Sequence, residues 1–365
     1  PAEHLNEFQG VILSPVNNGP DQTAAKLNAV DNRSLLDVVL DPQFYIPQSG
    51  RGQLAEWPYF NAACDTADLG NSTWWADRCT QLVRIGTQLG VNSVCSPAIL
   101  PRTYDIAYYE ATIACAEQLA SAAHGTPLSV LLTAVVSFRD LASPGAADRI
   151  ASILTRTSIG RTYLIFYDEL TARQQWTDTE ALVGAMSLVR ALERAGTRVL
   201  VGYCGLDVML WKYSGATAVA TGKFFNLRRF GPERWQEVET EGRVVEYWTE
   251  ESLVTWLREN DVLLLHTRAP ALLSNDSNPF SRQILAALAA TPREPWRALS
   301  WRQYLWWFAK VEKEVAGRPN RAVELLRMAD RNWAQVESAP LLLFDRTNDG
   351  SWIRPWLNAL SGLAR

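Results

Sequence analysis

The sequence predicts an α/β fold, a (β/α)8 TIM barrel over residues 1–270 with a tryptophan-rich helical C-terminal extension over residues 271–365 that packs on the barrel. Three observations predict this fold class. Short apolar, β-branched runs alternate with amphipathic segments, several of these runs are almost uniformly apolar, and glycine closes four of the amphipathic segments. Continuous apolar runs are typical of parallel strands that are buried on both faces.

The apolar runs are the predicted strands of the barrel. Eight are read in chain order: Gly10–Pro15, Leu36–Gln43, Val91–Pro97, Leu128–Phe138, Thr162–Leu170, Thr197–Gly205, Ala216–Gly222 and Asp261–Thr267. Eight repeated strand–helix units favour a closed barrel over an open doubly wound sheet, which is the competing architecture. No GxGxxG or GxxxxGK[ST] sequence follows any run, so the usual nucleotide fingerprints of the open sheet are absent.

The amphipathic segments are the predicted helices. Glycine just after a periodic segment is a typical helix C-cap, and here it is found at Gly90, Gly125, Gly196 and Gly215. The pattern changes after Arg268, where SRQILAALAA, WRQYLWWFAKVEKEVAG and RAVELLRMADRNWAQV predict helices of the extension. A turn at Asn348-Asp349-Gly350 precedes one more predicted helix.

Composition narrows the classes of partner and the cellular compartment. A net charge of −4 argues against a broad grip on a phosphate backbone, which requires many basic residues on one face. No apolar run approaches the ~20 residues of a membrane span, so we expect no membrane association. The five cysteines are odd in number and widely spaced, which favours a reducing cytoplasm over a disulfide framework. The tryptophans between Trp296 and Trp356 form either core or a surface for a homodimer or a partner protein.

Two carboxylates stand where a barrel carries its chemistry, at the carboxyl ends of strands. Asp41 and Asp168 each interrupt an apolar strand at this end and are the candidate catalytic residues for acid–base work. The alternative for each is a loop cap or an ion pair with an arginine. Glu169 is adjacent to Asp168 and would point away from it in an extended chain. His266 ends the eighth predicted strand and is a candidate ligand contact or a rim histidine.

Two loops are candidate binding elements. The loop from Asp41 to about Ser72 is long enough to be a lid or a binding element, the alternative being a self-packed excursion. Lys223, Arg228 and Arg229 follow the seventh predicted strand, where such barrels often hold a phosphate, unless they form an outer solvated loop. No C-x-x-C, H-x-H or H-E-x-x-H pattern occurs, and we expect neither a metal site nor a cofactor.

Four short motifs, in chain order, resemble the tRNA-guanine transglycosylase superfamily, whose (β/α)8 barrel exchanges guanine for a 7-deazaguanine base. LDPQFY resembles the motif of the general-base aspartate, which implies this role for Asp41 and substrate contacts for Gln43 and Tyr45. FYDEL is similar to the motif that reads the purine edge, through Asp168 and beside it Glu169. YCGLD resembles the backbone turn against the base, and GKFFNLRRFG is similar in placement and arginines to a further motif; their residues are Gly205, Leu206, Gly222, Lys223, Arg228 and Arg229.

The resemblance covers Val11 to about Gly231 and has two departures. The nucleophilic aspartate of the family falls near Thr221 or Gly222 here, and the zinc subdomain is absent. The resemblance therefore implies a divergent, catalytically degenerate member that binds or exchanges a 7-deazaguanine-type base or nucleotide, acting as a glycosyltransferase if it is active. Its relatives imply a nucleic-acid modification or phage-defence context, with nucleic acid or a modified protein as partner.

Two other functions stay open. The first is a barrel hydrolase or lyase that uses Asp41 and Asp168 as an acid–base pair on a sugar or small metabolite. The second is a non-catalytic scaffold whose tryptophan-rich extension binds a partner. An exposed apolar patch on the segment from Trp296 to Trp356 would favour the scaffold.

Overall fold

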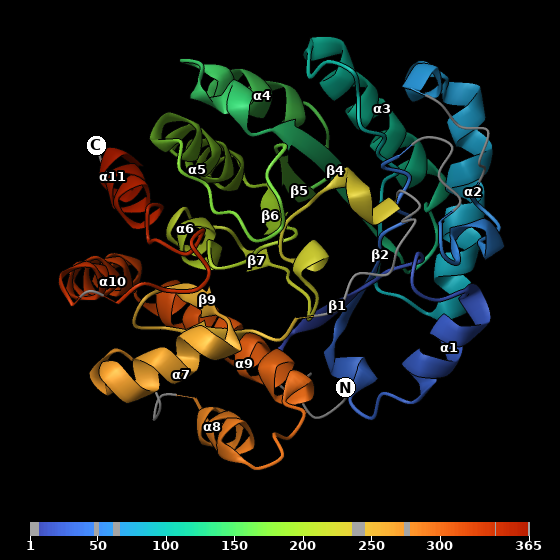
Figure 1. The fold of residues 1–365 in the computed structure, drawn as a ribbon. Helices are drawn as coiled ribbons and strands as arrows, with labels where there is room; N and C mark the ends of the chain where they lie inside the picture. Colours follow the sequence, from blue (N-terminus) through green and yellow to red (C-terminus); the bar gives the residue numbers. More distant parts are fainter. Residues whose placement is uncertain are drawn as a thin grey trace.

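Seven parallel strands form a curled sheet at the centre of the protein (Figure 1). In this computed structural model the described residues are 7–46, 51–60, 66–235, 245–273, 278–339 and 341–363. The strands pair in chain order, so each neighbours the next along the sequence: β1 (Gly10–Leu13), β2 (Asp37–Leu40), β3 (Ser93–Cys95), β4 (Ser129–Ser137), β5 (Arg161–Tyr167), β6 (Arg198–Val201) and β7 (Ala218–Val219). Each overlaps one of the first seven predicted strands, because uniformly apolar runs suit a sheet covered on both sides.

Helices surround this sheet on the outside (Figure 1). They are α1 (Pro20–Asn28), α2 (Ser72–Leu89), α3 (Ile106–Ala122), α4 (Ala146–Leu154), α5 (Thr179–Arg194) and α6 (Val208–Tyr213). The predicted glycine stops are confirmed as left-handed residues: φ is +61° at Gly90, +77° at Gly125, +86° at Gly196 and +99° at Gly215. Glycine adopts this conformation without a Cβ penalty, which is why it ends these helices.

The prediction of an eighth strand at Asp261–Thr267 is wrong, because this segment belongs to helix α7 (Glu259–Arg268). Val262 and Leu265, three residues apart, are fully buried, which is the spacing of a helix face. Acidic residues in the first turn favour the helix N-terminus. A short apolar run such as VLLL fits either period, and the sequence alone did not separate the two.

An antiparallel hairpin that the sequence did not predict lies between β7 and α7. Its strands are β8 (Trp248–Glu250) and β9 (Thr255–Leu257), and they form a sheet separate from the parallel one. Both strands are buried along their whole length. The hairpin therefore belongs to the core of the C-terminal half, and it contacts helix α9.

Helix α9 (Arg297–Gly317) links the two ends of the parallel sheet. Its Phe308 stacks on Phe8, just before β1, with ring centroids 6.4 Å apart. Its Tyr304 hydroxyl lies 2.6 Å from Oγ1 of Thr221, just after β7. Among the described residues β1 and β7 are the edge strands of the sheet, so α9 contacts the segments beside both edges.

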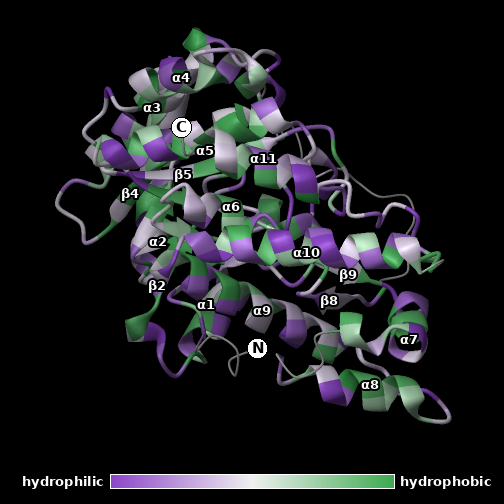
Figure 2. Cartoon of the chain, turned by 90° about the vertical axis from the view of Figure 1, so that its left-hand side faces the viewer, coloured by the Kyte–Doolittle hydropathy of each residue, from purple (hydrophilic) through white to green (hydrophobic). Residues whose placement is uncertain are grey.

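The remaining C-terminal helices continue the same core. They are α8 (Ser281–Ala289), α10 (Asn320–Ser338) and α11 (Ile353–Leu363), and α11 packs against α5 and α10. Figure 2 shows hydrophilic and hydrophobic residues alternating along α10, as in a helix with one buried face. Five tryptophans of this region join the main hydrophobic cluster: Trp296, Trp307, Trp333, Trp352 and Trp356. Trp301 and Trp306 are half-buried, so the tryptophans are core rather than an exposed patch.

The structure bears on two expectations from the sequence, which concern membrane association and the state of the cysteines. No helix in the described ranges is long and apolar enough to cross a membrane. The four described cysteines (Cys79, Cys95, Cys115 and Cys204) are free and buried, while Cys64 lies outside the described residues.

Candidate functional site

Asp41 is a buried carboxyl group directly after β2. Its relative exposure is 1 %, and it accepts hydrogen bonds from the Gln43 N–H at 3.1 Å and the Tyr45 hydroxyl at 3.0 Å. No cation lies within 4 Å of this carboxyl among the described ion pairs. Burial raises the pKa of Asp41 from 3.8 to about 7, against the hydrogen bonds and the more distant charge of Arg234, which lower it. Asp41 therefore exchanges a proton near neutral pH.

The backbone is strained on two sides of this carboxyl. Gln43 and Tyr203 are buried non-glycine residues with φ of +58° and +56°. Such residues cost on the order of 1 kcal/mol or more and cluster at functional sites. The Gln43 side-chain oxygen accepts from Ser14 Oγ at 3.3 Å and from the Val16 N–H at 3.4 Å. The strain is thus held where the segments after β1, β2 and β6 meet.

Arg234 supplies the positive charge of the site from the segment after β7. Its Nη2 donates to Ser14 Oγ at 2.8 Å, and its Nε has no hydrogen-bond partner among the described residues. Burial lowers the pKa of Arg234, although the negative charge of Asp41 acts in the opposite direction. Arg51 donates to the Arg234 carbonyl at 2.9 Å, which ties the long second loop to this segment.

Aromatic rings enclose the carboxyl. The Tyr45 ring lies 5.0 Å from both Phe230 and Trp235, and Phe230 lies 5.2 Å from Tyr203. Burial raises the pKa of the Tyr45 and Tyr203 hydroxyls, so both stay protonated at neutral pH. Tyr163 belongs to the same buried cluster. Asp41 is therefore a carboxyl group that can gain or lose a proton near neutral pH and is surrounded by aromatic rings.

Asp168 and Glu169 lie after β5 and share one cation. Asp168 Oδ1 pairs with Arg139 Nε at 2.8 Å, and Glu169 pairs with Arg139 Nη2 at 3.5 Å. The Asp168 side chain is 12 % exposed and that of Glu169 75 %. The ion pair with an arginine, one of the two interpretations of Asp168 from the sequence, is present. Asp168 thus stands at a rim and differs in environment from Asp41.

The turn after β6 is organised by Asp207, a residue for which no role was predicted from the sequence. Its carboxylate accepts from the Gly205 N–H at 2.6 Å and from Trp176 Nε1 at 2.9 Å. Leu206 beside it is buried, and a Cβ on Gly205 would lie 3.1 Å from both the Arg228 carbonyl and the Trp256 ring. The Gly205 N–H therefore already has an acceptor within the protein.

The arginines of the loop after β7 are buried against rings. The Arg228 guanidinium lies 3.4 Å from the Tyr304 ring centroid and donates to the Gly222 carbonyl at 3.2 Å. Its burial lowers its pKa to about 10. Arg229 lies 3.8 Å over the Trp176 ring. Neither guanidinium lies on a solvated loop, whereas Lys223 is exposed beside two aromatic rings, Phe224 at 4.8 Å and Trp301 at 4.7 Å.

Two further predicted elements have clear positions. His266 is exposed on helix α7, so its expected place at the end of an eighth strand is wrong. The second loop is packed down in its described part: Trp57 Nε1 donates to the Asn18 carbonyl at 3.0 Å, and the Tyr59 hydroxyl to the Pro42 carbonyl at 3.3 Å. Residues 47–50 and 61–65 of this loop lie outside the described residues.

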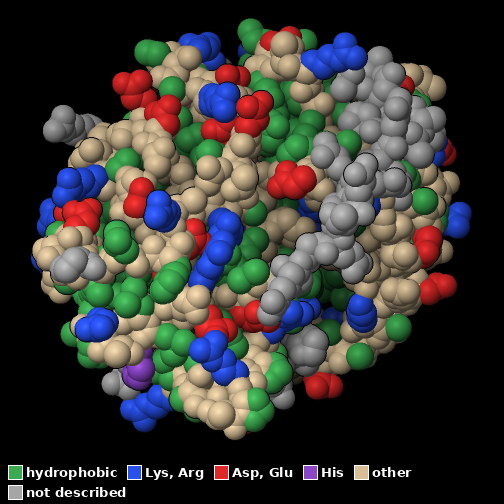
Figure 3. All heavy atoms as spheres, viewed as in Figure 1, with side chains coloured by type: hydrophobic (Ala, Val, Ile, Leu, Met, Phe, Trp, Pro, Cys, Tyr) green, Lys and Arg blue, Asp and Glu red, His purple; other side chains and the backbone are tan. Residues whose placement is uncertain are grey.

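Comparisons with known proteins add no family to this geometry. No protein-family model matches the sequence, and no curated protein matches it. Within the described ranges, no group of three or more His, Cys, Asp or Glu side chains has an arrangement suited to a metal ion. On the face seen in Figure 3, basic and acidic side chains are interspersed rather than gathered by sign. The candidate functional site is therefore defined by the buried Asp41 carboxyl and the residues around it.

Proposed function

We propose that the protein is a divergent transglycosylase-like (β/α)8 barrel that binds a 7-deazaguanine-type base or its nucleotide at the carboxyl end of its strands. In this proposal α9 covers the position of the eighth strand. The observation that carries the proposal is the buried Asp41 carboxyl with its pKa near 7, set between strained backbone segments and aromatic walls. A planar nitrogen heterocycle suits this environment, because rings stack on aromatic faces and a desolvated carboxyl binds ring N–H groups strongly.

Asp41 is the proton-carrying residue of this proposal. When ionised, it accepts a hydrogen bond or a proton from a ring nitrogen, and when protonated it donates one. Tyr45 supports the ionised form through its hydroxyl, and Arg234 supports it through its charge. Gln43 and Tyr45 are the adjacent substrate contacts that the family resemblance implies.

Asp168 takes the second polar contact to the base. Its Oδ1 already accepts from Arg139 and from the Glu169 N–H, so Oδ2 is the atom assigned to the ligand. The Gly205 N–H has Asp207 as its acceptor, so the contribution of this turn is shape rather than a free donor. In this proposal the base is thus recognised by two carboxylates, the buried Asp41 and the partly exposed Asp168, which is paired with Arg139.

A covalent glycosyl intermediate is not part of the proposal. The hydroxyl nearest to the family's nucleophile position, Thr221 Oγ1, donates to the Cys204 carbonyl at 2.7 Å and contacts the Tyr304 hydroxyl. Its proton is thus already used within the protein, and its oxygen is in contact with a second hydroxyl. We therefore propose binding of the base, or transfer without a protein nucleophile, with nucleic acid or a modified protein as the source of the base.

The alternatives have less support in the geometry. An acid–base pair on a sugar requires Asp168 to move a proton, whereas its Oδ1 is engaged by Arg139 and by the Glu169 N–H. In the described part of the segment from Trp296 to Trp356 the tryptophans are buried or half-buried, so a scaffold surface there would depend on other exposed apolar side chains, Leu342 and Phe344.

Calorimetric titration with guanine, 7-deazaguanine and a simple sugar, at pH 6 and pH 8, tests the proposal. We expect saturable binding of a purine-type base that strengthens at pH 8, because Asp41 is then ionised. Asp41→Asn should abolish the pH dependence and weaken binding about tenfold or more, as expected for a lost hydrogen bond to a charged group. Glu110→Gln, an exposed change on α3, is the matched control. Absence of base binding at both pH values would overturn the proposal.

A further inference from the structure

An open groove of about 400 Å³ lies on the outer side of helix α7, at the periphery of the molecule (Figure 1). One face of the helix and one residue of the segment before α11 line it: Asn260, Leu263, Leu264, Thr267, Arg268 and Phe344. The opposite face of α7 is packed in the core, where Val262 and Leu265 are fully buried. Helix α7 therefore has a second, partly apolar stripe that faces the solvent.

The second wall of the groove is a segment with two large exposed apolar side chains. Leu341 and Leu343 pack against the main hydrophobic cluster, whereas Leu342 and Phe344 are 87 % and 66 % exposed. This alternation is that of an extended chain, so Leu342 and Phe344 point to the same side. The Phe344 N–H donates to the Asp261 carboxylate at 2.6 Å, which fixes this wall to α7. Neighbouring apolar side chains exposed in this way mark interaction sites.

The charge that lines the groove is positive. Arg268 is the one charged residue among the described lining residues, and Arg346 follows Phe344 by two residues. Both arginines are exposed, and neither has an ion pair among the described residues. The acidic side chains of α7 and of residues 341–349 are engaged by other groups: Glu259 by Arg293, Asp345 by Arg173 and Arg258, Asp261 by the Phe344 N–H, and Asp349 by the Ser351 N–H. Arg268 is therefore available to a carboxylate of a partner.

We propose that the groove between α7 and residues 342–344 binds an acidic amphipathic helix of another protein. The apolar side chains of that helix pack on Leu263, Leu264 and Phe344, and one of its carboxylates binds Arg268. A second copy of this chain does not suit the groove, because a symmetric contact would bring two Arg268 side chains together. The proposal is independent of base binding at Asp41.

The test is a selection from a displayed library of amphipathic helices with random polar positions, carried out on the full chain with counter-selection on Phe344→Ser. We expect the enriched helices to have Asp or Glu beside their apolar face. Fluorescence anisotropy then measures the affinity of an enriched peptide, which should fall about tenfold in Phe344→Ser and should also fall with rising salt concentration.

A reversal of charge tests the role of Arg268. Arg268→Glu should weaken the acidic peptide about tenfold. The same peptide with lysine at its acidic positions should bind this variant more tightly than it binds the wild type. A peptide preference that Arg268→Glu leaves unchanged would contradict the assigned contact.

Two exposed residues outside the groove provide matched controls. Leu35→Ser changes a leucine that is 79 % exposed, and Arg102→Glu reverses the charge of an exposed arginine without a described ion pair. Both variants should keep the wild-type affinity, and thermal melting shows that each variant is folded. The proposal is overturned if the selection yields no helix that depends on Phe344, or if the enriched helices are basic. A wild-type dimer that Phe344→Ser dissociates in sedimentation would overturn it too, in favour of a second copy of the chain.

Discussion

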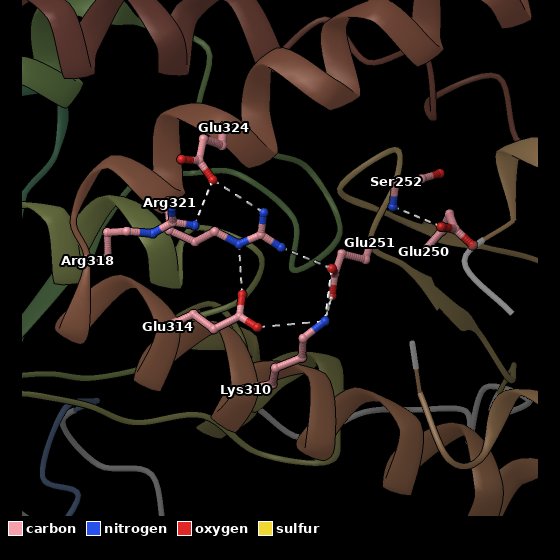
Figure 4. Close-up of polar contacts among 8 residues, drawn as sticks. All are labelled: Glu250, Glu251, Ser252, Lys310, Glu314, Arg318, Arg321 and Glu324. Atoms are coloured by element: carbon pink, nitrogen blue, oxygen red, sulfur yellow. Dashed lines mark hydrogen bonds and ion pairs between the residues drawn. The ribbon is translucent and has the colours of Figure 1, made fainter. Parts of the chain in front are cut away.

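Two buried carboxylates of this protein have opposite surroundings. Glu251, at the tip of the β8–β9 hairpin, accepts Lys310 Nζ at 2.8 and 3.0 Å and Arg321 Nη2 at 3.5 Å (Figure 4). Asp41 has two neutral donors and no described cation in contact. A carboxylate in contact with cations forms ion pairs that hold neighbouring elements together, whereas the desolvated Asp41 without such contacts titrates near neutrality. Glu251 therefore anchors the hairpin to α9 and α10 through ion pairs, whereas Asp41 is free to exchange a proton.

The two regions also share a feature, a strained residue. Val254 in the hairpin has φ of +48°, comparable to Gln43 and Tyr203 in the Asp41 site. In the hairpin the neighbouring carbonyls are held by side chains of α10: Trp333 Nε1 donates to the Leu253 carbonyl at 2.9 Å, and Asn332 to that of Ser252 at 2.8 Å. Strain alone therefore does not mark the site, and the unpaired charge of Asp41 does.

The largest expected change in the free energy of unfolding is for the substitution of Asp41. A folded pKa of about 7 against 3.8 means that the folded state binds this proton more tightly than the unfolded state. The resulting penalty is absent below about pH 4, grows up to about pH 7 and is then constant, at on the order of 4 kcal/mol. Asp41→Asn removes the charge and should raise the free energy of unfolding at pH 8 by up to this amount, measured by urea denaturation.

The pH profile of this first variant is its own control. At pH 4 the wild type and Asp41→Asn should differ by only about 0.6 kcal/mol from this charge, since the carboxyl is then protonated when folded and partly protonated when unfolded. A gain that is the same at pH 4 and pH 8 would mean that packing, not charge, separates the two proteins.

A smaller effect of opposite sign is expected on the hairpin. Glu251→Gln leaves Lys310 and Arg321 without their carboxylate, and both side chains are about one fifth exposed, at 21 % and 23 %. We expect a loss of about 2 kcal/mol of stability, less than for a fully buried pair. Glu324→Gln removes an exposed partner of Arg318 in the same network and should cost about 0–1 kcal/mol. Equal melting temperatures for the two variants would contradict the anchor role of Glu251.

The smallest effect is expected at His266. Because it is exposed on α7 rather than placed at a strand end, His266→Ala should change stability by no more than about 0.5 kcal/mol. The base titration described above should also give the same affinity for this variant. A clear loss of base binding would place α7 at the ligand site and would require a different description of the carboxyl edge of the parallel sheet.

The sequence predicted the parallel strands well because their apolar runs are local signals, and Asp41 was found because it interrupts one of them. It did not reveal the contact of Arg234 with Ser14, which are 220 residues apart, or the left-handed Tyr203. The buried state of Arg228 was also not readable, because its aromatic partners come from distant segments such as α9. Local patterns therefore placed Asp41 at the end of a strand, while its charge balance depended on tertiary contacts.

The most direct test of the central claim is the pKa of Asp41 itself. Carbon-13 NMR of the carboxyl resonances, with the Asp41 signal assigned by its loss in Asp41→Asn, measures this value across pH 4 to 9. We predict a midpoint of about 7 for Asp41. A midpoint near 4, the ordinary value for an aspartate, would show that the carboxyl is ionised throughout and would remove the basis for its proton-carrying role.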